Sequence, residues 1–322
     1  MQDRTLQAYR FLLQRTAGPY IGVIFDGFNG GCRQVNVRFY PVSAEPGPGQ
    51  KRCAWTDPRD SNSQTGGRIM RYELADYEWV AIKPMLPNKP RGVARVNDRR
   101  VLNGIFWVLR SGAPWRDLPN GFSPYTTCYN RFVRWRRVGV WGRIIDAFAA
   151  AHDAAVQMID TSIVRVHQHG ACITRNQRQS MGRSRGGLTS KIHAVVDSNG
   201  LPVRLALSPG EAHDVRLAGK LLSRLKVGSM LLADRGYDAD WIRELAMKKG
   251  AWANIPPKSN RSDPICFSPY LYRARNQVER FFNRIKQCRR VATRYDRLAA
   301  NYLAFVQLAS IRLWLRLNES AS

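Results

Sequence analysis

The hydrophobic pattern of this chain changes its period near residue 154, and that change limits the possible folds more than any other feature. Apolar residues recur at helical spacing from 71 to about 150, whereas VQMIDTSIVRVH at 156–167 alternates like a strand. Residues 190–210 then predict two strands joined by a hairpin turn at 197–200, and the remainder predicts helix, strand, helix, strand and helix. This order indicates an α/β fold, a mixed sheet flanked by helices, preceded by a small all-helical region.

The helical region is predicted to consist of helix, turn and basic helix. A first short helix ends at Pro87, a second ends at Ser111–Gly112, and a third is expected over 126–141 after a turn. In the third helix arginines alternate with aromatic residues, as a helix-turn-helix reader of DNA requires. The candidate DNA-contacting residues there are Arg131, Arg134, Arg136 and Arg137. A small helical bundle with a charged face is the alternative.

The net charge points to a polyanionic partner. The 322 residues include 51 Lys and Arg against 24 Asp and Glu, a formal charge of +27. Nucleic acid suits such an excess of arginine, because guanidinium groups grip phosphates bidentately and binding releases counterions. A ribosomal-type structural protein fits less well, since the apolar residues are periodic. A membrane surface also fits less well, since no apolar run approaches about 18 residues.

Cysteine and histidine usage predicts neither disulfides nor a zinc site. The six cysteines are scattered without a C-x-x-C pair, which is typical of reduced thiols in a cytoplasmic protein. His167 and His169 would lie on one face of a strand, and two histidines alone do not indicate zinc.

Three segments are expected along the chain. Residues 1–69 contain a Pro-, Gly- and Ser-rich tract without period and are predicted to be leader, linker or disordered sequence. The working protein is then expected to start near Met70, with a genuine accessory segment as the alternative. Residues 70–150 are assigned to the helical DNA-binding domain and residues 151–318 to the α/β domain.

Three acidic residues are candidates for a single site. Asp160 is expected to end the first strand and Asp234 the fourth, so both would emerge at one edge of the sheet, where a helix at 271–289 can bring Glu279. Converging carboxylates repel one another unless a cation intervenes, and oxygen ligands without Cys or His select Mg²⁺ or Mn²⁺. Singly, Asp160 could instead cap the strand end, and Asp234 could form a turn.

The helix expected at 272–286, YRARNQVERFFNRIK, carries two distinct faces. Its polar face holds Tyr272, Arg275, Glu279 and Lys286, and its apolar stripe holds Leu271, Val278, Phe281, Phe282 and Ile285. Taken alone, these residues describe an exposed basic helix with an Arg275–Glu279 ion pair. With the two aspartates upstream, Glu279 becomes a third metal ligand and the apolar stripe pins the helix to the sheet. Whether Arg275 serves the carboxylate or a phosphate stays open.

Further DNA contacts are expected from a basic stretch and from the same helix. GRSRGGLTSK at 182–191 is predicted to be a loop that leads into a strand and touches DNA through Arg183, Arg185 and Lys191. It lacks the residue order of a phosphate-binding P-loop. On the helix, Lys286 would hold a phosphate or base, and Tyr272 would stack on a sugar or base.

The spacing Y-x2-R-x3-E-x6-K, with the runs IDTSIVRVHQHG, GRSRGGLTSKIHAVVD and LADRGYDAD, resembles bacterial insertion-sequence transposases of the DDE type, the insertion-sequence-five family in particular. The resemblance covers about residues 70 to 317, without departure at the acidic positions. It implies an RNase H-like core in which Asp160, Asp234 and Glu279 are catalytic and hold two divalent ions, Mg²⁺ or Mn²⁺. The segment 1–69 departs from the pattern.

The expected function is that of a DNA transposase. It would bind the terminal inverted repeats of an insertion sequence and catalyse metal-dependent end cleavage and strand transfer into target DNA, within a homo-oligomeric synaptic complex. The expected location is the bacterial cytoplasm, in association with the nucleoid. The alternatives are a catalytically inactive DNA-binding regulator or decayed copy, and a stand-alone RNase H-like nuclease.

Overall fold

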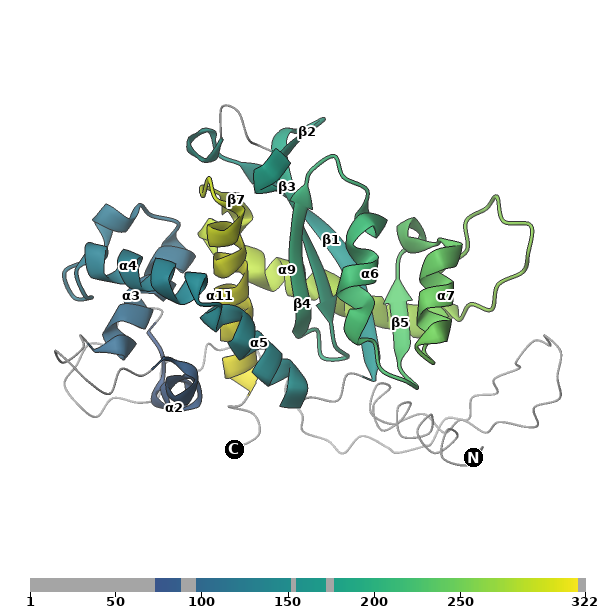
Figure 1. Ribbon diagram of the computed structural model, residues 1–322, viewed down its shortest axis with the longest axis horizontal. Coiled ribbons are helices and arrows are strands. Elements are labelled where there is room, and N and C mark those ends of the chain that lie inside the picture. Colours follow the sequence, from purple (N-terminus) through teal and green to yellow (C-terminus); the bar gives the residue numbers. More distant parts are fainter. Residues whose placement is uncertain (1–72, 88–96, 152–154, 172–176, 318–322) are drawn as a thin grey trace, which may run out of the picture. The chain divides into compact units, whose positions relative to one another are not determined.

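The computed structural model describes residues 73–87, 97–151, 155–171 and 177–317 (Figure 1). The expected leader at 1–69 lies outside the described residues. All elements named below belong to one compact unit that begins at Arg71.

The helical region contains α2 (Asp76–Ile82), α3 (Asp98–Ser111), α4 (Tyr125–Arg137) and α5 (Val140–Ala151). The Asn97 side chain caps α3 by accepting hydrogen bonds from two backbone amides, and the left-handed Gly112 ends it where the sequence predicts. The prediction of a single helix over 126–141 is wrong. Gly139 adopts a φ of 71°, which an α-helix cannot continue through, so α4 stops there and the apolar helix α5 begins.

A mixed sheet forms the centre of the remaining chain (Figure 1). Its strands are β1 (Val156–Val166), β2 (Gly182–Ser184), β3 (Gly187–Val196), β4 (Pro202–Pro209), β5 (Met230–Ala233), β6 (Trp252–Asn254) and β7 (Thr293–Arg294). The order is β2-β3-β1-β5-β6, with β4 paired to β3 and β7 paired to β1. Because β3 is antiparallel to β1 and β4 while β5 and β6 are parallel additions, the expected RNase H-like mixed sheet is confirmed.

Two hairpins flank β3. The β3–β4 turn is the predicted one: Asp197 accepts hydrogen bonds from the amides of Asn199 and Leu201, and Gly200 has a φ of 75°. The basic stretch 182–191, expected to be a loop, is instead the β2–β3 hairpin. Ser184 pairs with Gly187, which leaves only residues 185–186 in the turn.

Asp160 lies inside β1 and not at its end, so that expectation is wrong. β1 continues to Val166 because residues 158–165 pair with β3. The parallel pairing of β1 with β5 nevertheless stops at Ile159 and Ala233. Asp160 is the next residue of β1, and Asp234 directly follows the end of β5, so both lie at the same level of the sheet.

The end of β1 also corrects the expected histidine pair. β1 ends at Val166, so His167 and His169 lie at a 3₁₀ turn over Gln168–Gly170 instead of on a strand. Their rings still meet edge to face, with centroids 4.8 Å apart.

Helices cover both faces of the sheet (Figure 1). On one face, α6 (Ala218–Leu221) and α7 (Asp240–Lys248) pack on a core that includes Ile159, Val195 and Leu231. The first helix expected after the hairpin is broken there into α6 and two short 3₁₀ turns, Asp214–Leu217 and Leu222–Arg224. The other face is covered by α9 (Asn276–Lys286), which is preceded by α8 (Pro269–Tyr272) and followed by α10 (Arg289–Ala292).

The last helix, α11 (Ala299–Leu317), joins the helical region to the sheet. It packs against α5, α3 and α4 as well as β4, and Arg312 pairs with Glu78 at 3.0 Å. The domain boundary near residue 150 stays a prediction. No helix in the described part of the chain is long and apolar enough to cross a membrane.

Candidate active site

The two aspartates are fixed by the backbone that follows them. Asp160 Oδ1 accepts a hydrogen bond from the amide of Thr161 at 2.8 Å, and Asp234 Oδ1 accepts one from the amide of Gly236 at 3.0 Å. Each bond occupies one oxygen and leaves Oδ2 for another partner. Asp234 reaches its position because β5 ends at Ala233, where the chain turns into a short 3₁₀ segment.

The helix α9 brings Glu279 to these aspartates. The predicted apolar stripe anchors it, since Val278, Phe281, Phe282 and Ile285 are all buried, whereas Leu271 is only half-buried. α9 contacts β1 and β3, the two strands that pair around Asp160. The segment before α9 is tighter than expected, because Arg273–Arg275 is a 3₁₀ turn.

Arg275 lies between two of the candidate ligands. Its Nη1 donates to Glu279 Oε1 at 2.7 Å, and its Nη2 lies 3.5 Å from Asp160 Oδ2. The predicted Arg275–Glu279 pair is thus present, and Asp160 joins it from a distant part of the sequence. The guanidinium also lies over the Tyr272 ring, 5.8 Å from its centroid.

The electrostatics of Asp160 are those of a buried carboxylate near other acids. Burial, reinforced by the charges of Asp234 and Glu279, raises the pKa of Asp160 to about 6, although the Thr161 amide and Arg275 oppose the shift. For Arg275, burial works to lower the pKa, but the surrounding groups, Asp160 first among them, outweigh it and raise the pKa. The cluster therefore has excess negative potential that a cation would relieve.

The donor chemistry of this cluster fits a divalent ion, but the ligands are not preassembled. Within the described residues, no three His, Cys, Asp or Glu side chains stand close enough together to hold a metal. Glu279 is 55% exposed and paired with Arg275, while Asp160 is only 15% exposed. One carboxylate in a strand, one directly after the neighbouring strand and one on the facing helix, with no histidine or cysteine among them, form a set of the kind that Mg²⁺ and Mn²⁺ prefer.

Lys286 contacts β1 near this cluster. Its Nζ donates to the carbonyl of Ile163 at 3.2 Å, three residues beyond Asp160 on the strand. Burial lowers the pKa of Lys286. Tyr272 is half-buried beneath Arg275 and in edge contact with Phe267, at 5.5 Å between ring centroids.

The β2–β3 hairpin presents exposed cations, but not all of those predicted. Arg183 and Arg185 are exposed. Lys191 instead forms an internal pair, donating to Asp214 Oδ1 at 2.8 Å and to the carbonyl of Ala212 at 2.7 Å.

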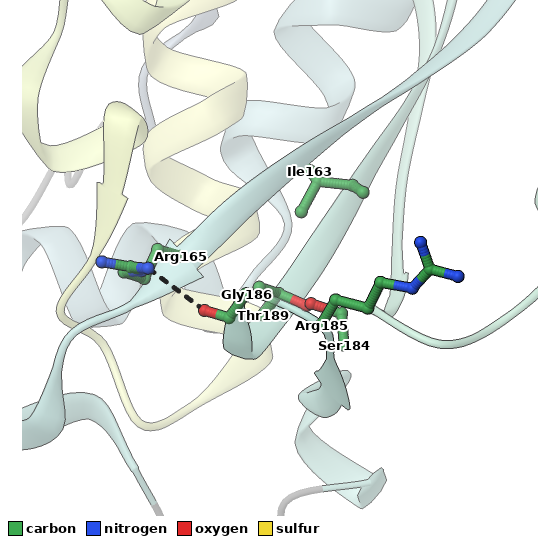
Figure 2. A pocket seen from close by; sticks show the side chains of 6 residues that line it. All are labelled: Ile163, Arg165, Ser184, Arg185, Gly186 and Thr189. Atoms are coloured by element: carbon green, nitrogen blue, oxygen red, sulfur yellow. Dashed lines mark hydrogen bonds between the residues drawn. The ribbon is translucent and has the colours of Figure 1, made fainter.

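A cavity of about 470 Å³ opens between this hairpin and the end of β1 (Figure 2). Its lining consists of Ile163, Arg165, Ser184, Arg185, Gly186 and Thr189. Arg165 donates to the carbonyl of Gly186 at 3.2 Å, and Figure 2 shows Arg185 extending to the opposite side. Basic side chains thus border the surface that continues from Asp160 along β1.

The arginines of α4 divide into exposed and internal ones. Arg134 and Arg137 are exposed, and Arg136 is half-buried. Arg131 forms a salt bridge to Asp98 at the start of α3 and lies 5.3 Å from the centre of the Trp135 ring. Arg131 therefore joins the two helices of the expected helix-turn-helix.

Sequence reasoning missed two residues beside the cluster. Asp214 pairs with Lys191, and Tyr237 is buried with a hydroxyl that finds no hydrogen-bond partner among the described residues. Burial, together with the charges of Asp214, Asp160 and Asp234, raises the pKa of Tyr237. The signal for Tyr237 was its place three residues after Asp234, because one 3₁₀ turn lets the Tyr237 amide donate to the Asp234 carbonyl at 3.0 Å. No comparable local signal identifies Asp214.

Comparisons with known proteins match both the helical region and the α/β region to transposases. The sequence matches "Putative transposase of IS4/5 family" over residues 74–145 and "Transposase DDE domain" over residues 151–314. A "Putative transposase for insertion sequence element IS6501" from Brucella ovis is 41% identical over 130 residues, which are 40% of this chain and 100% of that protein. "Insertion element IS402 uncharacterized 16.2 kDa protein" from Burkholderia cepacia is 38% identical over 106 residues, 29% of this chain and 72% of that protein.

Solved structures with a similar course of the chain include a piggyBac transposase synaptic complex with hairpin DNA, at a TM-score of 0.45 and 12% identity, covering 76% of this chain and 72% of that one. A Mos1 transposase paired-end complex follows at a TM-score of 0.23 and 12% identity, covering 73% of this chain and 82% of that one. The family is shown by the sequence: the domain matched over 151–314 takes up more than half of the 322 residues and contains all three candidate acids. This chain belongs to the DDE transposases of insertion sequences.

Proposed function

We infer that this DNA transposase binds the terminal inverted repeats of its element and cleaves and joins DNA at the cluster of Asp160, Asp234 and Glu279. The observation that carries the proposal is that Asp160 in β1 and Asp234, directly after the neighbouring β5, lie at the same level of the sheet, with Glu279 linked to Asp160 through Arg275. Transposase DDE domains generally use divalent metal ions. Here the carboxylates of Asp160, Asp234 and Glu279 would hold two Mg²⁺ or Mn²⁺ ions.

When bound, such ions supply Lewis-acid activation of the attacking oxygen and stabilisation of the departing one. The protein's own groups orient the carboxylates for this chemistry. The amides of Thr161 and Gly236 hold one oxygen of each aspartate, so the other oxygen points to a fixed place. Water would attack at the element's end in the hydrolytic step, and the freed 3′-hydroxyl would attack target DNA in strand transfer.

The DNA would lie along the cations near this cluster. Lys286 is placed beside β1, and Arg183 and Arg185 are exposed on the β2–β3 hairpin. On α4, the exposed Arg134 and Arg137 supply a second contact region for the inverted repeat. Arg131 and Lys191 would support these surfaces from within, since both are paired to acids. A homo-oligomeric synaptic complex in the bacterial cytoplasm, with the nucleoid, is part of the same proposal.

The test is Mg²⁺-dependent nicking of a duplex oligonucleotide that carries the element's end. Asp234→Asn retains the shape of the side chain, and we expect it to lower cleavage by about 10²-fold or more, because a charged ligand is removed. Asp240→Asn is the matched control, since Asp240 begins α7 and its side chain is 78% exposed. Equal cleavage by wild type and Asp234→Asn would contradict the assignment. Cleavage without joined products would favour the stand-alone nuclease, and binding without cleavage the inactive regulator.

A further inference from the structure

Arg275 holds the position between the candidate ligands that a cation must enter. Its guanidinium touches Glu279 at 2.7 Å and Asp160 at 3.5 Å, and its side chain is only 14% exposed. The Nε atom is buried and has no hydrogen-bond partner in the described structure. The two carboxylates therefore account for the polar contacts that hold the guanidinium, with Tyr272 beneath it.

The Asp160 oxygen that Arg275 approaches is the one that a metal would need. Oδ1 already accepts the Thr161 amide, so Oδ2 is the oxygen left for a cation. The 3.5 Å contact to Asp160 is longer than the 2.7 Å contact to Glu279. A divalent ion that approached Asp160 would break the weaker contact first.

We propose that Arg275 is an internal counter-cation of the metal-free transposase, which holds Asp160 and Glu279 until a divalent ion displaces the guanidinium from Asp160. This inference rests on the proposed function of the cluster. A buried carboxylate beside other acids is costly without a cation, and a guanidinium can supply that charge before metal arrives. Metal binding then includes the breaking of an ion pair, and it is weaker than the carboxylates alone would allow.

If Arg275 had the opposite role, its removal would change the affinity for metal in the opposite direction. If Arg275 only positioned Glu279 as a ligand, removing it would loosen Glu279 and weaken metal binding. If Arg275 competes with the metal, removing it strengthens metal binding in the absence of DNA. The guanidinium released from Asp160 would be free to meet a phosphate, which would answer the question that the sequence leaves open.

The experiment measures the affinity of the full chain for Mn²⁺ alone, without DNA, by the electron paramagnetic resonance signal of free Mn²⁺. We expect Arg275→Gln to bind Mn²⁺ about fivefold or more tightly than wild type, the size of a typical coupling between sites. Arg280→Gln is the matched control: it removes the same charge from the residue next to Glu279, but that side chain is exposed. It should change the affinity by less than about twofold at physiological salt, where exposed charges are screened.

Equal or weaker binding by Arg275→Gln would overturn the proposal, and so would an equal gain in Arg280→Gln. Asp160→Asn separates this failure from failure of the proposed function, because undiminished Mn²⁺ binding by Asp160→Asn would mean that the cluster is not the metal site. If Arg275→Gln does not fold, Arg275→Met removes the charge but keeps a long, unbranched side chain. It should bind Mn²⁺ more tightly than wild type, and the absence of any gain would count against the proposal. The rise in melting temperature on adding Mn²⁺ gives a second readout, larger in the variant than in wild type.

Discussion

Single acidic residues in this protein are held in two contrasting ways. Asp238 is fully buried and completely satisfied, with Arg243 and Arg261 each at 2.7 Å and the amide of Lys258 at 2.8 Å. Burial alone would raise the pKa of Asp238, but these partners outweigh it and lower the pKa to about 2. Asp160 has a looser cationic partner at 3.5 Å and a raised pKa. The ion pairs of Asp238 stabilise the fold, whereas Asp160 keeps an oxygen that can exchange its cationic partner for a ligand.

Asp238→Asn should therefore destabilise the fold. Removing the buried carboxylate leaves Arg243 without an acidic partner and Arg261 with only the exposed Asp240, and we expect a decrease of about 3 kcal/mol in the free energy of unfolding by urea at pH 7. Because the folded pKa is depressed, the stabilisation is complete above the unfolded pKa of about 3.9 and disappears as the pH falls through about 2. Asp240→Asn, which breaks only an exposed pair to the same Arg261, should cost less than about 1 kcal/mol. Similar decreases in both variants would contradict this account.

His193 gives a pH dependence in a milder range. It is fully buried, its Nε2 lies 2.7 Å from Ser208 Oγ, and burial lowers its pKa to about 4. Protonation thus favours the unfolded chain, so the contribution of His193 to stability, complete above pH 6.5, should fall by roughly 3 kcal/mol as the pH drops from 6.5 to 4. The raised pKa of Asp160 acts in the opposite direction in this window and is common to wild type and variant. In His193→Gln the slope of unfolding free energy against pH over that window should flatten. An unchanged slope, measured by urea unfolding at several pH values, would show that other groups titrate there.

At the scale of helices and strands, the sequence predicted the type of an element and its terminating turn better than its length. The hairpin at Asp197–Gly200 and the end of α3 at Gly112 follow from local turn chemistry and were correct. The length of β1 was wrong because its second half is stabilised by pairing with β3, a contact that alternation alone does not reveal. The candidate acids could be predicted from the spacing of the motif. The contact between Arg275 and Asp160 could not, because it depends on how α9 packs on the sheet.

Substitution of Gly112 tests how closely α3 and α10 approach each other. It has a φ of 74°, and a Cβ there would lie 2.9 Å from the Cβ of Arg289, at the start of α10. Gly112→Ala combines backbone strain with this clash and should cost roughly 2–3 kcal/mol of stability. Gly228→Ala has a similar φ of 76° but nothing within 4 Å, so it should cost only about 1 kcal/mol. Equal melting temperatures for the two variants would show that α10 moves aside without cost.

For the molecule as a whole, the net charge of +27 overstates the number of cationic side chains that can contact DNA. Several arginines form hydrogen bonds or ion pairs inside the protein. Arg294 is fully buried and donates to Ser190 Oγ at 2.7 Å and to the carbonyl of Asp296 at 2.9 Å. Arg290 pairs with Asp296, and Arg131 pairs with Asp98. Composition predicts the class of partner, but only the fold separates structural arginines from those that can reach a phosphate.

That separation predicts different consequences for cations that look alike in the sequence. Replacing both Arg183 and Arg185 by Gln should weaken binding of a duplex that carries the element's end. It should also reduce the slope of log K against log salt by about 0.9 for each phosphate that the variant no longer neutralises. Arg131→Gln should instead lower the melting temperature, because its guanidinium holds α3 to α4. Lys248→Gln on α7, 75% exposed, is the control for a charge away from the proposed surface, and its salt slope should match wild type. A slope that fell equally in the hairpin double variant and in Lys248→Gln would mean that the whole surface attracts DNA and that the hairpin has no particular role.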